Sequence, residues 1–306
     1  MEEQYVSNLS NFLQWEQLDH AEDWVLHPKN ISGYLSIDET SLSQGELYTI
    51  VTNKLAKGRK GALVAIIKGT DSQKVIDILH KISKRLRNKV VEVTLDMASS
   101  MKKIVEKCFT KATQVTDRFH VQKLALDALQ EIRIKHRWEA IDQENKEIEL
   151  CKELKHKFIA NKLANGDTLK QLLARSRYLL FKNKSTWTPS QWQRSEVLFK
   201  LYPDIEQAYN LCQKLGDIYK NTKSKNIALT KLAQWYDKVE KAGFKSFNTI
   251  ARSIQHNYQT ILNFFDNRST NASAESFNAK IKGFRSQFRG VRNIPFFLFR
   301  LSNIYA

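Results

Sequence analysis

The distribution of strand and helix signals along the 306 residues constrains the fold more than any other feature of the chain. Residues 34–120 contain short runs of β-branched and apolar residues, whereas residues 121–265 carry almost no strand signal and predict helices. The expected order is strand, strand, strand, helix, strand, helix, strand. A long helical stretch follows, and a last helix is predicted over residues 271–284.

Five strands are predicted in the first region. The first three are joined by short links, as in a meander, and the last two each follow a helix, as in right-handed crossovers. This order matches a ribonuclease H-like fold: an α/β architecture with a mixed five-stranded sheet and helices on both faces. The predicted strands are Tyr34–Ile37, Glu46–Asn53, Ala62–Ile67, Val90–Leu95 and Ala112–Thr116.

The domain organisation expected from this pattern is a core interrupted by an all-helical insertion. Residues 1–33 form an N-terminal lead-in, and residues 34–121 form the first part of the core. Residues 122–265 form the helical insertion domain, and residues 266–306 contain the helix that completes the core.

Acidic residues follow two of the predicted strands. Asp38 comes directly after the first strand and Asp96 directly after the fourth. If these strands are neighbours, both carboxylates project from the same end of the sheet, where open α/β sheets bind ligands. A third acid, Glu275, lies on the last helix. An aspartate after a strand is also a common turn or cap residue, so each acid alone carries a weaker signal than the three together.

Three carboxylates at one place repel one another and raise one another's pKa, unless divalent cations offset the charge. Mg²⁺ prefers oxygen ligands and commonly uses one or two carboxylates together with phosphate oxygens. Two such ions roughly 4 Å apart hold both the attacking and the leaving oxygen in an in-line phosphoryl displacement. The three acids therefore favour phosphoryl-transfer chemistry.

The charge of the chain points to a polyanionic partner. Lys and Arg total 49 and Asp and Glu total 32, which gives a net charge of +17. Such an excess is typical of nucleic-acid binding, and the alternative is a basic surface that is only solvated. The three cysteines form no CxxC pair, and no apolar run reaches the ~20 residues of a membrane span. We expect an intracellular protein that faces nucleic acid and no membrane.

Four segments occur in an order that is specific in combination. They are Tyr34–Thr40 (YLSIDET), Thr94–Met97 (TLDM), Asp117–His120 (DRFH) and Asn271–Lys282 (NASAESFNAKIK). Together they resemble the DDE transposases of bacterial insertion sequences, specifically the ISL3-type group and its ISAon-like branch. The resemblance extends from about residue 30 to the end of the chain.

The resemblance implies a catalytic role for Asp38, Asp96 and Glu275 as ligands of two Mg²⁺ (or Mn²⁺) ions. The implied reaction is cleavage of DNA at transposon ends, followed by strand transfer into target DNA. In the similar hAT and Mutator-like transposases, a Cys-x-x-His motif follows the fifth strand. Asp117 stands here at the cysteine position and His120 at the histidine position. Asp117 competes with Asp96 as a metal ligand, and the family pattern favours Asp96.

Supporting residues are expected around these acids. Asn271, Glu275, Asn278 and Lys282 recur at helical spacing and share one helix face, where the two asparagines would orient water or phosphate. His120 either donates a hydrogen bond to a phosphate oxygen or only positions its loop. The basic residues expected to contact DNA, which otherwise form solvated faces, are Lys57, Arg59, Lys60, Arg118, Lys282, Arg285 and Arg289.

Relatives usually carry a zinc-binding and helix-turn-helix region before the first aspartate, but only 37 residues precede Asp38 here. We therefore expect the end-recognition module to be a separate small protein or to be missing altogether. The resemblance implies DNA as the main partner and a possible homodimer. The expected location is the bacterial cytoplasm at the nucleoid. Two alternatives stay open, namely a nuclease with the same core and a domesticated DNA-binding protein without catalysis.

Overall fold

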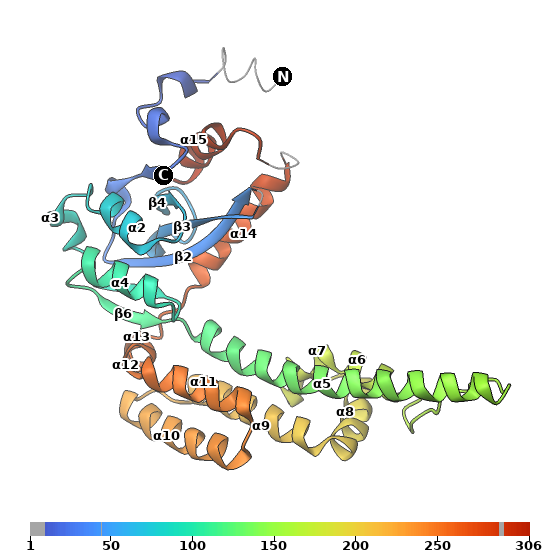
Figure 1. Cartoon of the computed structure of the whole chain (residues 1–306). Helices are drawn as coiled ribbons and strands as arrows, with labels where there is room; N and C mark the ends of the chain where they lie inside the picture. The colour runs from blue at the N-terminus through green and yellow to red at the C-terminus, as the bar shows by residue number, and fades with distance from the viewer. Residues whose placement is uncertain (1–9, 44, 288–290) are drawn as a thin grey trace. The chain divides into compact units, whose positions relative to one another are not determined.

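The computed structural model describes residues 10–43, 45–287 and 291–306, which divide into two compact units (Figure 1). Unit 1 combines the chain up to His120 with residues Asn257–Ala306, and unit 2 consists of Val121–His256. Both the beginning and the end of the chain thus contribute to unit 1.

A mixed sheet forms the centre of unit 1. The strands are β1 (Trp24–Leu26), β2 (Tyr34–Ser43), β3 (Glu46–Asn53), β4 (Leu63–Lys68), β5 (Glu92–Leu95) and β6 (Thr113–Thr116). Their order across the sheet is β1-β4-β3-β2-β5-β6. The pairs β1–β4, β4–β3 and β3–β2 are antiparallel, whereas β2–β5 and β5–β6 are parallel. All five predicted strands are present, and the first and fourth of them are neighbours as expected.

The prediction of five strands was wrong by one, because the described sheet has six strands. The additional strand, β1, lies in the segment that was interpreted as a lead-in. It pairs Val25 with Ile66 of β4, and Val25 is completely buried. A strand of three residues is too short to show alternation, so its stability comes from the neighbouring strand and the core.

Helices cover both faces of the sheet, as predicted. On one face, α2 (Ser72–Leu79) and α4 (Ser99–Cys108) pack on a core that includes Leu35 and Ile37 of β2. On the other face, α14 (Ala272–Gln287) and α15 (Ile294–Tyr305) pack on a core that includes Leu42. Because successive strand residues point to opposite faces, even-numbered residues of β2 face α14, which lies along this strand (Figure 1).

Short helices complete unit 1. They are α3 (Lys84–Arg87), α12 (Tyr258–Leu262) and α13 (Phe264–Asn267), with the 3₁₀ turns η2 (Phe12–Gln14), η3 (Leu18–His20), η4 (Pro28–Asn30) and η5 (Lys54–Ala56). Helix α12 lies against β6, and the hydroxyl groups of Thr260 and Thr116 form a hydrogen bond of 2.7 Å. The segment that returns to unit 1 at Asn257 therefore packs first against the last strand of the sheet.

Unit 2 contains helices and connecting segments only, and the structure describes every one of its residues. Its long first helix, α5 (Arg118–Glu153), begins at the end of unit 1. The remaining helices are α6 (Leu169–Arg175), α7 (Arg177–Leu180), η6 (Lys184–Thr186), α8 (Pro189–Leu201), α9 (Pro203–Asn221), α10 (Lys225–Ala242) and α11 (Lys245–His256). Trp235 anchors α10 on α9, because its buried indole N–H donates to the Leu211 carbonyl at 2.9 Å.

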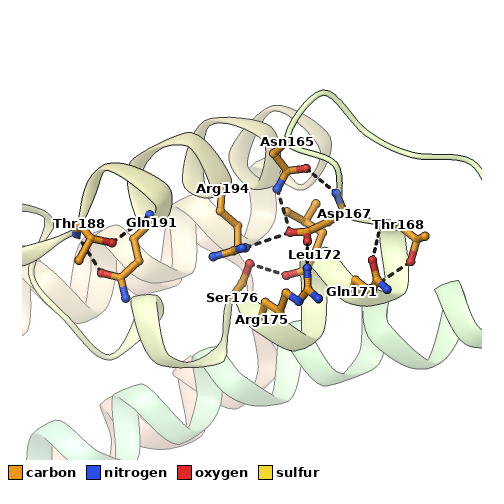
Figure 2. Close-up of polar contacts among 10 residues, drawn as sticks. All are labelled: Asn165, Asp167, Thr168, Gln171, Leu172, Arg175, Ser176, Thr188, Gln191 and Arg194. Carbon is orange, nitrogen blue, oxygen red and sulfur yellow. Dashed lines mark hydrogen bonds and ion pairs between the residues drawn. The ribbon is translucent and has the colours of Figure 1, made fainter.

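A buried carboxylate fastens the segment before α6 to the helices of unit 2. Asp167 accepts hydrogen bonds from Arg175, from Arg194 on α8 and from the Asn165 side chain (Figure 2). Burial alone would raise the pKa of Asp167, but the hydrogen bonds and charges of Arg194 and Arg175 outweigh it and hold this pKa below its usual value. The next residue, Thr168, begins α6 with a capping box formed with Gln171.

Asp167→Ala is expected to destabilise unit 2 by about 2 kcal/mol, because three donors around the site lose their acceptor. Urea unfolding followed by circular dichroism measures the change. Glu196→Ala, at an exposed acid on α8, is the matched control and should leave the midpoint unchanged within error. Equal midpoints for Asp167→Ala and the unchanged chain would contradict the role of Asp167.

His27 is expected to make unit 1 sensitive to acid. Burial lowers its pKa from 6.5 to about 4, and its Nε2 pairs with the hydroxyl of Ser302 on α15 at 3.0 Å. The unfolded chain therefore binds a proton on His27 more tightly than the folded chain does. The contribution of His27 to the free energy of unfolding is complete above pH 6.5 and is lost as the pH falls toward 4. Between pH 7 and pH 5 the loss is roughly 2 kcal/mol.

Urea unfolding of the unchanged chain and of His27→Gln at both pH values tests this prediction. The unfolding free energy of His27→Gln should fall less between pH 7 and pH 5. Equal losses for the two proteins would show that His27 does not carry the acid sensitivity.

Candidate active site

The face of β2 that meets α14 carries polar residues at its centre. Ser36 and Asp38 alternate with the core residues Leu35 and Ile37 and so point toward α14. The Ser36 hydroxyl donates to the side-chain oxygen of Asn271, which immediately precedes α14. Two helical turns further on, Asn278 Nδ2 donates to Asp38 Oδ2 at 2.7 Å. These contacts fix the register of α14 on β2.

Asp38 lies at the centre of a group of acids. Its Oδ1 accepts a hydrogen bond from the backbone N–H of Glu39 at 2.9 Å. Burial is the main cause that raises the pKa of Asp38, and the carboxylates of Asp96 and Asp117 add to it, while His120 opposes them. The structure thus brings Asp38 within electrostatic reach of both candidates for the second acid.

Asp117 is deeply buried where β6 passes into α5. Its backbone N–H donates to the Leu95 carbonyl at 2.9 Å, which continues the pairing of the two parallel strands. Its Oδ1 accepts from the backbone N–H of Asn271 at 3.3 Å, whereas its Oδ2 is buried without a partner among the described residues. A buried carboxylate oxygen without a donor is costly, so this position needs a functional or structural explanation.

Asp96 has a different environment. It follows β5 directly, and its Oδ1 accepts from the backbone N–H of Ala98 at 2.8 Å, as in a turn before α4. By alternation with Val93 and Leu95, whose side chains lie in the opposite core, Asp96 lies on the same face as Asp38. Its carboxylate raises the pKa of Asp38 and also that of Glu39.

Glu275 lies in the first turn of α14 and its side chain is exposed. Its pKa is raised first by partial burial and then by the carboxylates of Asp117 and Asp38, while His120 lowers it. His120 occupies the first turn of α5 and therefore influences Asp38 and Glu275 alike. Asp38, Glu275 and His120, which come from separate segments, thus influence one another electrostatically, whereas Asp96 acts on Asp38 but not on Glu275.

These carboxylates have the donor chemistry that a divalent oxygen-binding cation requires. A bound cation would relieve the raised pKa values of Asp38 and Glu275. Asp117 Oδ2 and Asn278 Oδ1 are buried oxygens without hydrogen-bond donors among the described residues. Among the described residues, however, no three His, Cys, Asp or Glu side chains are gathered closely enough to hold a metal ion. The residues fit the ion in type, and their side chains are not arranged as a finished coordination sphere.

Lys54 lies just before the basic turn of Lys57, Arg59 and Lys60, but its side chain points inward. Its Nζ donates to Thr94 Oγ1 at 2.6 Å and pairs with Glu92 at 3.3 Å. Burial lowers the pKa of Lys54, while Glu92 and Asp117 raise it. Residue type and position do not indicate this arrangement, because a lysine beside a basic turn resembles its exposed neighbours.

The cations predicted to contact DNA differ in their surroundings. Lys57, Arg59, Lys60 and Lys282 are exposed. The turn that carries the first three lies next to α14, because Lys280 Nζ donates to the Gly58 carbonyl at 2.7 Å.

Two other predicted cations have contacts within unit 1. The Arg118 guanidinium lies over the Phe264 ring at 5.9 Å, and Arg285 donates to the Ser41 carbonyl at 3.5 Å. Both side chains are half-buried. Arg289 lies outside the described residues.

Comparisons with known proteins give one match. The family model of ISL3-type DDE transposases, described as a transposase, matches residues 35–301. No curated protein and no solved structure matches the chain. Within the part of the chain that the structure describes, no helix has the length and apolar character needed to cross a membrane.

Proposed function

This chain belongs to the ISL3-type family of DDE transposases, and from this premise we propose that it cuts DNA at the ends of an insertion sequence and joins those ends to target DNA. The observation that supports the proposal is that Asp38 lies within electrostatic reach of Asp96, Asp117 and His120, and that Glu275 lies within reach of Asp38, Asp117 and His120. These residues come from four separate segments of the chain.

The proposed fold is ribonuclease H-like. In this proposal unit 1 is the catalytic core, and the helices between β6 and α14 are an insertion within it, which the sequence places at residues 122–265. The mixed sheet, in which the parallel strands β2, β5 and β6 follow an antiparallel meander, supports this assignment.

Asp38, Asp96 and Glu275 are the proposed ligands of two Mg²⁺ or Mn²⁺ ions. When bound, such ions polarise phosphoryl oxygens and neutralise the charge that develops during displacement. The chain's own contribution is to hold the three carboxylates on one face: β2 carries the first, the turn after β5 the second, and α14 the third. The contact between Asn278 and Asp38 sets how α14 presents Glu275.

The remaining polar residues have proposed supporting roles. His120 donates a hydrogen bond to a phosphate oxygen of the DNA, from a position between Asp38 and Glu275. Asp117 and Asn271 hold the start of α14 against the sheet, because the Asn271 backbone N–H donates to Asp117 and its side chain accepts from Ser36. This positioning requires a buried, well-packed pair, which matches their low exposure.

The proposed DNA path follows the exposed cations beside α14. Lys57, Arg59, Lys60 and Lys282 are placed to contact phosphates, and Arg118, Arg285 and Arg289 are proposed as further contacts. Their charge would make binding strongly dependent on salt, since each neutralised phosphate releases counterions. DNA is accordingly the proposed main partner, in the bacterial cytoplasm at the nucleoid.

The experiment that tests the function uses the purified chain, Mg²⁺ and DNA that spans the genomic flanks of its coding sequence. Cleavage at discrete ends and joining of the freed 3′ hydroxyl to a second DNA support a transposase. Cleavage without joining would indicate a nuclease with the same core. DNA binding that is insensitive to the three acids, with no product in Mg²⁺ or Mn²⁺, would indicate a DNA-binding protein without catalysis.

A further inference from the structure

The face of α5 opposite its packed side carries apolar residues with the spacing of a coiled coil. Ile134, Trp138, Ile141 and Ile148, with Asn145 between the last two, recur at intervals of 4, 3, 4 and 3 residues. The side chain of Ile134 is 41% exposed and that of Trp138 is 62% exposed. We call these five residues the α5 stripe.

The α5 stripe is largely open in the described chain, because Ile134, Trp138 and Asn145 are exposed, while Ile141 and Ile148 are half-buried. Ala140, Gln143 and Glu147 lie on the other side of α5, where they line a small cavity together with Phe158 and Leu163. At 100° per residue, these positions and the stripe lie on different sides of the helix. The helix therefore packs on unit 2 with one side and leaves an apolar seam on the other.

Two basic residues near the stripe, which could otherwise bind nucleic acid, form hydrogen bonds within unit 2 instead. Arg133 is buried and donates to Gln130 and to the Leu173 carbonyl. His136 pairs with Asp204 at 2.5 Å and with Glu139 at 3.0 Å. The exposed side chains that flank the stripe carry both signs and so do not form the continuous basic surface that phosphates favour. They are Lys135, Arg137, Asp142 and Glu149.

We propose that the α5 stripe pairs with the same stripe of a second copy of this chain, in an antiparallel two-stranded coiled coil. The two-fold axis lies between Trp138 and Ile141, so that Trp138 of each copy packs against Ile141 of the other. Ile134 then lies opposite Asn145 of the second copy. In a two-fold dimer, both copies use the same self-complementary surface.

Charge complementarity selects this partner and this direction. Lys135 and Asp142 flank the stripe one heptad apart, and neither forms an ion pair with another described residue. In the antiparallel register Lys135 of each copy lies beside Asp142 of the other, which gives two attractive pairs. In the same register Asp127 lies opposite Lys152 of the second copy at each end of the seam, and Ile148 lies opposite Glu131.

Parallel pairing would place like residues opposite each other in every core layer. Asp127, Glu131 and Lys152 would each face an identical charge, and the two bulky Trp138 side chains would share one layer. The charges along α5 therefore favour the antiparallel arrangement. This inference does not depend on the chemistry proposed for unit 1.

A charge exchange in the full-length chain tests the pairing. Sedimentation velocity over a concentration series is expected to show a dimer of the unchanged chain. Lys135→Glu and Asp142→Lys should each weaken self-association roughly tenfold, because attractive pairs become repulsive. The double variant should restore the affinity to within about threefold. Leu150→Asp, on the far side of α5, is the control and should leave the affinity unchanged.

Cysteine cross-linking tests the register in a Cys151→Ser background. With diamide as oxidant, Ile134→Cys combined with Asn145→Cys should form an intermolecular disulfide, whereas Asn145→Cys alone should stay monomeric on a non-reducing gel. The opposite pattern would overturn the antiparallel register. If the chain stays monomeric at every concentration and Trp138→Ala weakens DNA binding, the α5 stripe binds nucleic acid and not a second copy of the chain.

Discussion

Asp38→Asn is expected to reduce Mg²⁺-dependent cleavage of end-containing DNA by at least about 10³-fold, while DNA binding is retained. Asparagine has nearly the same shape as aspartate and keeps the oxygen that accepts from the Glu39 N–H. It lacks the negative charge that the proposed metal site requires. The amide N–H that replaces Asp38 Oδ2 can donate to Asn278 Oδ1 once the Asn278 amide turns over, so the contact with α14 is kept. The loss then reports the charge of this side chain and not its packing.

The matched control for Asp38→Asn is Glu39→Gln, the same change of charge at the next residue of β2. Its side chain points to the other face of the strand, and the backbone N–H that it supplies to Asp38 is preserved. Glu39→Gln should keep cleavage within about threefold. Single-turnover cleavage of labelled DNA measures both variants. If Asp38→Asn cleaved as fast as Glu39→Gln, the catalytic role of Asp38 would be wrong.

A comparison of Asp96→Asn with Asp117→Asn should identify the second acid. Asp96→Asn is expected to lose at least about 10³-fold in cleavage with an unchanged melting temperature, as a metal ligand in a solvated turn would. Asp117→Asn should lower the melting temperature, because a buried amide replaces a carboxylate that accepts from Asn271. Its cleavage should fall only about 10–100-fold, through the altered position of α14.

The two aspartates exchange roles if the opposite pattern is found. Full loss of cleavage in Asp117→Asn at an unchanged melting temperature, with activity retained in Asp96→Asn, would make Asp117 the ligand. The buried and unpartnered Oδ2 of Asp117 would then be explained by the metal. Cleavage and thermal unfolding must be measured on the same preparations, because only their combination separates the two roles.

The order of the sheet was predictable because each of its five longer strands has its own local signal. Glu46–Asn53 alternates, and Leu63–Lys68 is a continuous apolar run, as expected of a strand covered on both faces. Strand β1 was not predictable, since its three residues are stabilised by pairing with β4. The shared position of Asp38 and Asp96 followed from topology alone once their strands were taken as neighbours.

Side-chain direction was the part of the site that the sequence did not reveal. Lys54 lies just before the basic turn that carries Lys57, yet Lys54 is drawn inward by Glu92 and Thr94 while Lys57 stays exposed. Arg133 on α5 likewise donates to the Leu173 carbonyl in the core of unit 2. Such orientations depend on partners far away in sequence, so residue type and spacing do not determine them.

Anomalous diffraction from crystals of the protein soaked in Mn²⁺ tests the central claim most directly. If the proposed metal site is right, density for Mn²⁺ is expected among the carboxylates of Asp38, Asp96 and Glu275, with oxygen ligands at about 2.2 Å. Density held by another set of side chains, or none at this face in crystals of a protein that cleaves DNA in solution, would contradict it.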